Sequence, residues 1–165
     1  MRGLEMTLDE IIGFTTALPQ VGVLRAGPEN GAPEAAWGDV FFFHDPDGDA
    51  HERRRMPFAT IVVKDYPGFD TASELDRPGV FRVNIAVGRR LFEELVGHPP
   101  AAHPEHAAEV DPAAADRIIG HPVHAAQGWV AVVSPGEATS ARVRELLTAA
   151  RERDAARHTR RARRD

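Results

Sequence analysis

Five of the eight histidines in this chain lie in one segment, residues 98–124. They are His98, His103, His106, His121 and His124. Imidazole rings transfer protons near neutral pH and bind zinc, copper and nickel, so the segment raises two hypotheses, acid–base catalysis and metal binding. A third hypothesis is a proline-rich loop that carries solvated histidines.

The spacing within this segment favours the loop. His98, His103 and His106 are separated by four and two residues, which matches no ligand motif of known geometry. His121 and His124 would approach one another on a helix, but Pro122 biases the preceding residue toward an extended backbone. We therefore predict an exposed loop without a bound metal. The alternative is a metal shell completed by acidic side chains of the same segment, namely Glu105, Glu109, Asp111 and Asp116.

The remaining motifs for chemistry are incomplete. Residues 45–49, DPDGD, resemble the start of a calcium-binding loop, but Ala50 stands where the loop needs glycine and Met56 where it needs glutamate. We therefore predict a turn between two strands. The sequence has neither the G-x-S-x-G motif of a nucleophilic serine nor a glycine-rich phosphate loop. Because it has no cysteine, thiolate catalysis, disulfides and cysteine-ligated metals are also excluded.

Polar side chains on the middle strands give the best candidate for a binding site. Lys64, Arg82 and Asn84 fall on the polar sides of two predicted strands, where such side chains can bind a carboxylate or a phosphate. The candidates for the rim of this site are His44, Trp37 and Trp129. We predict that these residues bind a ligand and that none is catalytic. The alternative is that this side of a single-layer sheet is simply solvated.

Charge is unevenly distributed along the chain. The formal net charge is −5, and residues 151–165 contribute seven arginines against Glu152, Asp154 and Asp165, which is +4, so the rest carries −9. Nucleic acids bind clustered basic side chains on a folded surface, so this balance argues against a nucleic-acid partner. We expect the partner to be a small anionic ligand or another protein.

Hydrophobic periodicity predicts the elements that position these residues. Thr7 and Glu10 form a capping box, and apolar side chains at helical spacing predict a helix over 7–18. Alternating patterns predict five strands, at 20–26, 36–45, 56–65, 80–87 and 128–136. Further helices are predicted over 89–97 and from Thr139 or Ser140 onward, with a helical turn over 112–120. Short connections favour an antiparallel sheet, so the predicted fold is α+β, with about five strands and helices packed on one face.

Length and composition predict one domain and a tail. A chain of 165 residues suffices for one hydrophobic core, which we place in residues 5–152. Residues 153–165 are rich in arginine and lack an apolar face, so we predict that they are disordered. The sequence has neither a membrane span nor the apolar stretch of a signal peptide, so we expect a cytoplasmic protein without a membrane partner.

Several segments of the chain carry a family resemblance. They are TLDEIIGFTTALPQV, WGDVFFFHDPDGD, RMPFATIVVKDYPGFD, FRVNIAVGRRLFEELVG and HPVHAAQGWVAVVSPGEATSARVRELLTAA. These segments resemble a group of uncharacterised bacterial proteins known only as a domain of unknown function. The resemblance extends over about residues 5–150 and implies no activity.

Three further features carry a more distant resemblance. They are the first helix ending in Leu18-Pro19, the "VN" strand followed by a helix, and Trp129 at the start of a strand before the last helix. They are similar to features of the MmcQ/YjbR-like proteins. That resemblance implies a small α+β sandwich and, for some members, DNA binding.

We therefore predict a small domain without catalysis or a cofactor of its own, which binds a small molecule or another protein. Two alternatives stay open at this point. One is a DNA-binding protein of the MmcQ/YjbR type. The other is an enzyme that uses Lys64, Arg82 and Asn84 together with one of the histidines.

Overall fold

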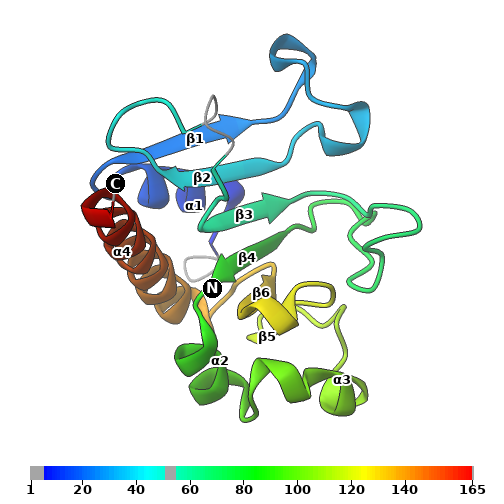
Figure 1. Cartoon of the computed structure of the whole chain (residues 1–165). Helices are drawn as coiled ribbons and strands as arrows, with labels where there is room; N and C mark the ends of the chain where they lie inside the picture. Colours follow the sequence, from blue (N-terminus) through cyan, green and yellow to red (C-terminus); the bar gives the residue numbers. More distant parts are fainter. Residues whose placement is uncertain (1–5, 51–54, 165) are drawn as a thin grey trace.

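Six antiparallel strands form one open sheet in the computed structural model (Figure 1). The structure describes residues 6–50 and 55–164, except for the side chains of residues 162 and 164. Along the sheet the strands are ordered β1-β2-β3-β4-β6-β5. Their bounds are β1 (Val21–Arg25), β2 (Val40–His44), β3 (Ala59–Val62), β4 (Arg82–Ala86), β5 (Ile119–Gly120) and β6 (Trp129–Val133). Every neighbouring pair in this order is antiparallel. The predicted α+β class is therefore confirmed.

Within the described residues, the sheet has one strand more than the five that we predicted. The additional strand, β5, pairs with the middle of β6 in the segment where we predicted a helical turn, so that prediction was wrong. The reason lies at Asp116, whose φ of +58° does not fit a right-handed helix. The carboxylate of Asp116 accepts hydrogen bonds from the backbone N–H groups of Gly136 and Thr139, which hold this turn against the segment that follows β6.

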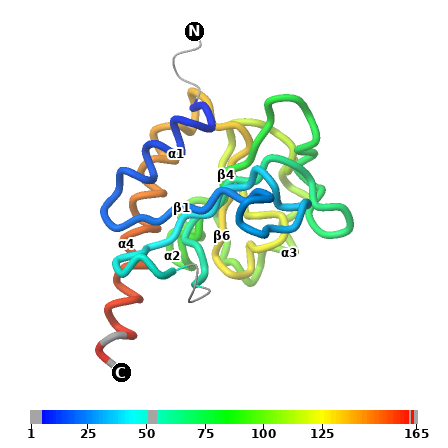
Figure 2. The backbone as a smooth tube through the Cα atoms, turned by 90° about the horizontal axis from the view of Figure 1, so that it is seen from above, coloured from blue at the N-terminus to red at the C-terminus, as the bar shows by residue number. Residues whose placement is uncertain are grey.

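Four α-helices accompany the sheet in the part of the chain that the structure describes. They are α1 (Leu8–Thr16), α2 (Arg89–Val96), α3 (His103–His106) and α4 (Ser140–Arg164). α1 and α4 are in contact and lie on the same face of the sheet, where α4 contacts β2 and β4 (Figure 2). α2 and α3 lie at the end of the sheet that carries β5 (Figure 1). None of these helices is long and apolar enough to cross a membrane.

The predicted capping box begins α1. Thr7 Oγ1 accepts a hydrogen bond from the backbone N–H of Glu10 at 3.1 Å. This bond satisfies one of the N–H groups that the first turn of a helix leaves without a partner. Ile11, one turn further, is completely buried against the core.

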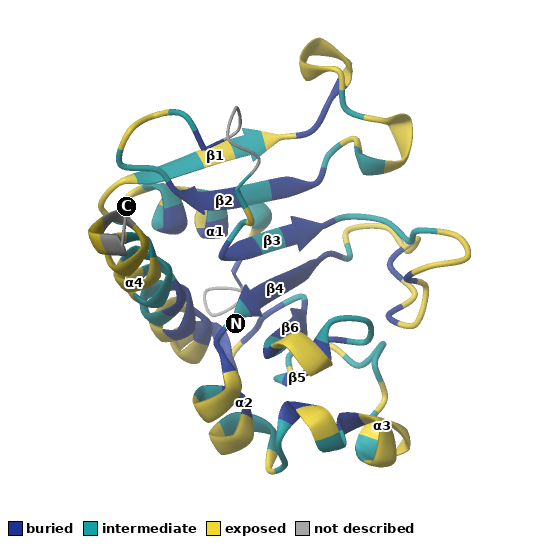
Figure 3. Cartoon of the chain, viewed as in Figure 1, coloured by how far each residue is buried: buried dark blue, intermediate teal, exposed yellow. Residues whose placement is uncertain are grey.

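The hydrophobic core lies between α4 and the sheet. Its members include Val83 and Ile85 of β4 and Val143, Leu146 and Leu147 of α4, all of them buried. Burying one such aliphatic side chain contributes roughly 1.5–3 kcal/mol. Figure 3 shows the buried residues concentrated in the central strands and on the side of α4 that faces them. Because successive side chains of a strand point to opposite faces, Arg82 and Asn84 lie on the face away from α4.

α4 continues to Arg164, through the segment that we predicted to be disordered. Side-chain contacts help to explain this difference. The ring of His158 meets the ring of His44 in β2 edge to face, with 5.4 Å between the centroids, and His158 is also hydrogen-bonded to Arg55. Alanine and arginine, which dominate this segment, also have high helix propensity. The last turns extend past the strands (Figure 2).

Candidate functional site

Arg82 lies at the centre of a buried polar cluster on the face of the sheet away from α4. Its side chain is 0% exposed. The two Nη atoms donate to the carboxylate oxygens of Asp70 at 3.0 and 2.5 Å, and Nη1 also donates to Ser73 Oγ at 3.0 Å. Nε donates to Asn84 Oδ1 at 2.7 Å, and Asn84 Nδ2 donates onward to Thr60 Oγ1 at 3.0 Å. Most of the donors of Arg82 are therefore taken up by the protein itself.

His121 closes this cluster from the segment between β5 and β6. Its Nδ1 accepts hydrogen bonds from the backbone N–H groups of Val123 and His124, both at 3.0 Å, and its Nε2 lies 3.2 Å from Nη2 of Arg82. Burial, together with the charges of Arg82 and His124, lowers the pKa of His121 to about 2. His121 is therefore a neutral ring near neutral pH and cannot act there as a cationic acid.

Asp39 is a second buried carboxyl group on the edge of this region. Its Oδ1 accepts a hydrogen bond from the backbone N–H of Val63 at 2.9 Å, and its Oδ2 accepts one from the hydroxyl group of Tyr66. Burial raises the pKa of Asp39 to about 6, although the bond from Val63 and the charges of Lys64 and Arg82 act in the opposite direction. This carboxyl group therefore changes its charge close to neutral pH.

The structure brings the predicted ligand-binding residues together only in pairs. Arg82 and Asn84 are joined in the buried cluster. Lys64 Nζ donates to the backbone carbonyl of Trp37, whose side chain is partly exposed and donates to the carbonyl of Ala32. The polar atoms of both pairs are bound to protein partners.

The other two predicted residues lie elsewhere. His44 is on the side of the sheet that α4 covers, where its Nε2 lies 3.3 Å from Oε1 of Gln20. Its Nδ1 is buried and has no hydrogen-bond partner among the residues that the structure describes. Trp129 lines a separate groove beside α4. The ligand-binding role of all of these residues stays a prediction.

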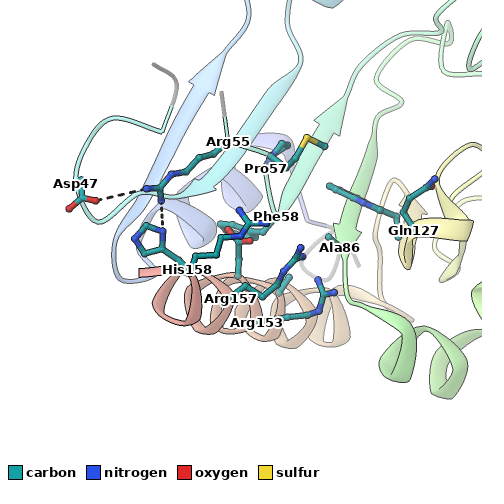
Figure 4. Close-up of a pocket in the computed structure, with 14 residues that line it drawn as sticks. Asp47, Arg55, Pro57, Phe58, Ala86, Gln127, Arg153, Arg157 and His158 are labelled. Carbon is teal, nitrogen blue, oxygen red and sulfur yellow. Dashed lines mark hydrogen bonds and ion pairs between the residues drawn. The ribbon is translucent and has the colours of Figure 1, made fainter. Parts of the chain in front are cut away.

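A groove of about 900 Å³ lies between the second half of α4 and one end of β3, β4 and β6 (Figure 4). Apolar groups on one side of it are Met56, Pro57, Phe58, Ala86 and Trp129. The arginines that line it are Arg55, from the segment before β3, and Arg153, Arg157 and Arg161 of α4. The acidic residues that line it, among those the structure describes, are Asp47 and Asp154. We call this site the arginine groove.

Three arginines of α4 form a stripe along the arginine groove. Arg153, Arg157 and Arg161 are spaced by four residues, so they lie on one side of the helix. No carboxylate among the described residues forms an ion pair with any of them. Burial lowers the pKa of Arg153, and the charges of Arg157 and Arg160 lower it further, whereas Asp154 raises it. The groove is therefore a region of positive charge within a chain whose net charge is −5.

Gly88 allows Arg153 to lie against the start of α2. The φ of Gly88 is +86°, a conformation that residues with a side chain rarely adopt. A Cβ atom at this position would lie 2.5 Å from Nε of Arg153. The conformation and the close approach together explain why glycine occupies this position.

Arg55 and His158 meet at one end of the arginine groove (Figure 4). Nη1 of Arg55 lies 2.8 Å from Nδ1 of His158. Because a guanidinium group has no acceptor atom, Nδ1 must accept this hydrogen bond and carries no proton. The other terminal nitrogen of Arg55 lies 3.9 Å from Oδ2 of Asp47, whose side chain is mostly exposed, so that ion pair is weak.

Histidines of the 98–110 segment form a stacked group. Nε2 of His98 lies 2.9 Å from Nδ1 of His103, and the rings of His98 and His106 stack with 4.2 Å between their centroids. Phe92 of α2 meets the rings of His98 and His103 edge to face, and His103 is buried. The prediction of solvated histidines was therefore wrong for His103, because α2 supplies an apolar partner. It was also wrong for His121, which is buried beside Arg82. Among the described residues, no group of three or more His, Cys, Asp or Glu side chains is arranged to hold a metal ion.

Comparison with known families gives one match over most of the chain. The model of the Family of unknown function (DUF6194) matches residues 6–163. The chain belongs to this family. The resemblance to a family without an assigned function, which the segments quoted above indicated, is therefore confirmed for DUF6194. No curated protein and no solved structure matches the chain, so the comparisons lend no support to the MmcQ/YjbR resemblance.

Sequence reasoning missed the arginine groove of this DUF6194 protein. A signal was present, because Arg153, Arg157 and Arg161 recur every four residues, but we interpreted the segment as a disordered tail. Arg55 and His158 could not have been paired from the sequence, since 103 positions separate them.

Proposed function

We propose that this protein is a non-catalytic binding module and that the arginine groove binds a small anionic ligand with an apolar part. The observation that carries the proposal is the stripe of Arg153, Arg157 and Arg161, which has no carboxylate partner among the described residues. Charge-assisted hydrogen bonds from guanidinium groups to carboxylates, sulfonates and phosphates are roughly twice as strong as neutral ones. We keep the cytoplasm as the proposed location.

The size and the lining of the groove support a small molecule as the ligand. Pockets for small molecules have volumes of roughly 300–1,000 Å³ and combine an apolar surface with a few polar groups. The arginine groove, at about 900 Å³, has this combination. Pro57 and Trp129 offer apolar surface to a ligand, and each Å² of apolar area removed from water contributes about 25 cal/mol.

A role without catalysis is better supported than the enzyme alternative. That alternative needs Lys64, Arg82 and Asn84 to reach a substrate. Nε of Arg82 is instead bound to Asn84, and Lys64 is bound to the carbonyl of Trp37. The nearby ring of His121 is buried and neutral, which removes it as a cationic acid.

Titration calorimetry with benzenesulfonate tests the proposal, because this probe combines a permanent negative charge with an apolar ring. We expect the wild-type chain to bind benzenesulfonate. Inorganic sulfate lacks the ring and benzyl alcohol lacks the charge, so both should bind more weakly. The Arg157→Ala/Arg161→Ala double variant should bind benzenesulfonate at least about tenfold more weakly, since one hydrogen bond to a charged group contributes roughly 1.5–3 kcal/mol.

A matched control separates the groove from the overall charge of α4. Arg160 and Arg163 are exposed on the same helix and do not line the groove, so Arg160→Ala/Arg163→Ala changes the net charge equally. This control should retain the wild-type affinity. An equal loss in both double variants, or no binding of benzenesulfonate by the wild type, would contradict the proposal.

The DNA-binding alternative that the MmcQ/YjbR resemblance implied has its own readout. The test is a gel shift with random duplex DNA at physiological ionic strength, where weak electrostatic binding is largely screened. We expect no shift. A shift that Arg157→Ala/Arg161→Ala abolishes would favour a nucleic acid over a small anion as the ligand of the groove.

A further inference from the structure

The protonation state of His158 determines what Arg55 can bind. Arg55 donates to Nδ1 of His158, and this hydrogen bond requires an unprotonated ring nitrogen. A proton on Nδ1 would turn that nitrogen into a donor facing another donor, so the contact would break. Arg55 and His158 would then be two neighbouring cations that both need an acceptor. An anion in the groove would supply it.

Within residues 6–50 and 55–164, charged and titratable groups surround His158 from the elements packed against it. They are His44 of β2, Asp47 and Arg55 of the segment between β2 and β3, and Arg151, Asp154, Arg157 and Arg161 of α4. The cations outnumber the carboxylates in this set, so a bound anion reduces repulsion. Burial lowers the pKa of His44, and the charges of Arg151 and His158 lower it further, so a proton on His158 makes protonation of His44 less favourable.

We propose that anion binding in the arginine groove is coupled to protonation of His158, so that the affinity for the anion rises as the pH falls. This inference rests on the proposed function and describes how the same site is regulated. In the free protein, Arg55 is held by the neutral ring of His158. In the complex, Arg55 and the protonated ring both donate to the anion.

The direction of the effect follows from thermodynamic linkage. An anion close to Nδ1 stabilises the charged ring, so the complex holds the proton more tightly than the free protein does. Protonation must then strengthen anion binding by the same factor. A shift of one unit in proton affinity corresponds to about a tenfold change in binding. We therefore expect the Kd for benzenesulfonate to fall between pH 8 and pH 6, by up to about tenfold for a shift of one unit.

Calorimetry of the full chain with benzenesulfonate measures this coupling. The probe stays ionised over the whole range and cannot take up the proton itself. Titrations at pH 7 in bis-Tris and in Tris, two cationic buffers with different ionisation enthalpies, give the number of protons taken up on binding. We expect a fractional uptake. This count needs no variant, so it tests the proposal even if a substitution at His158 disturbs folding.

Two variants assign the proton to a residue. His158→Gln keeps a side-chain oxygen that can accept from Arg55 but cannot titrate, so its Kd should be the same at pH 6 and pH 8. The control, His106→Gln on α3, lies outside the groove and should keep the wild-type pH dependence. A wild-type Kd that is independent of pH, or a His158→Gln variant with the full pH dependence, would overturn the coupling and leave the proposed function intact. Absence of binding at every pH would instead refute the proposed function.

Discussion

Replacing Arg82 with alanine should destabilise the fold strongly, because it leaves the carboxylate of Asp70 buried without its partner. The side chains of this ion pair are 0% and 7% exposed. Removing one member of a buried ion pair costs roughly 3–5 kcal/mol. The same substitution leaves Oδ1 of Asn84 and Oγ of Ser73 without their donor, and each unsatisfied buried group costs about 1–3 kcal/mol. We therefore expect a loss at the upper end of the first range.

Urea unfolding, followed by tryptophan fluorescence and circular dichroism, measures this loss. The control is Arg90→Ala. The side chain of Arg90 is 95% exposed, and its Nε lies 3.7 Å from Oε1 of Glu94. This substitution should lower the free energy of unfolding by less than about 0.5 kcal/mol. The double variant Arg82→Met/Asp70→Leu should be more stable than Arg82→Ala, because apolar replacement of both partners removes the uncompensated charge. If Arg82→Ala lowers the free energy of unfolding by less than about 1 kcal/mol, the reasoning is refuted. Arg82 would then again be a candidate ligand-binding residue.

Two further predictions concern buried or hydrogen-bonded titratable groups. Asp116→Ala should lower the free energy of unfolding by about 1–2 kcal/mol, because the carboxylate accepts from N–H groups at the start of α4. Burial raises the pKa of Asp116, but hydrogen bonds from Thr139 and neighbouring N–H groups outweigh burial and hold the pKa below 3.8. The stability that the Asp116 carboxylate contributes should therefore be present above pH 3.8 and be lost as the pH falls further. Thermal unfolding of both proteins at pH 7 and at low pH checks this, and an equal melting temperature at pH 7 would contradict it. The pKa of His121 is about 2 in the folded chain, whereas the ordinary value is 6.5. Between these two pH values the ring takes up a proton when the chain unfolds, so the stability of the wild type should decrease as the pH falls below 6.5. His121→Gln should have a shallower dependence in urea unfolding at pH 6.5 and 4.5, and an identical slope would mean that the ring is not buried in its neutral form.

The fold was largely predictable because local patterns determine most of it. Thr7 and Glu10 fix the start of α1, and the alternation along β4 separates Val83 and Ile85 from Arg82. β5 was not predictable, since its two residues are too few to show a period and pair only through the tertiary structure.

The candidate site was predictable only in part, because its contacts join distant positions. The sequence placed Arg82 and Asn84 on one face, but the partners that bury Arg82 are Asp70 and His121, which lie 12 and 39 positions away. Arg82 was therefore mistaken for an accessible cation. The arginine groove was missed for another reason. The four-residue spacing of its arginines is visible in the sequence, but the strands that form the other side of the groove are distant from them along the chain.

Side-chain NMR of the arginines tests the central claim most directly, because each Nε–Hε group reports separately on its surroundings. Titration of the full chain with benzenesulfonate should shift the Nε–Hε signals of Arg153, Arg157 and Arg161 along a saturating curve and leave that of exposed Arg90 unchanged. Shifts of equal size at Arg90 and at the groove arginines, or none at the groove arginines, would contradict the assignment of the groove as an anion-binding site.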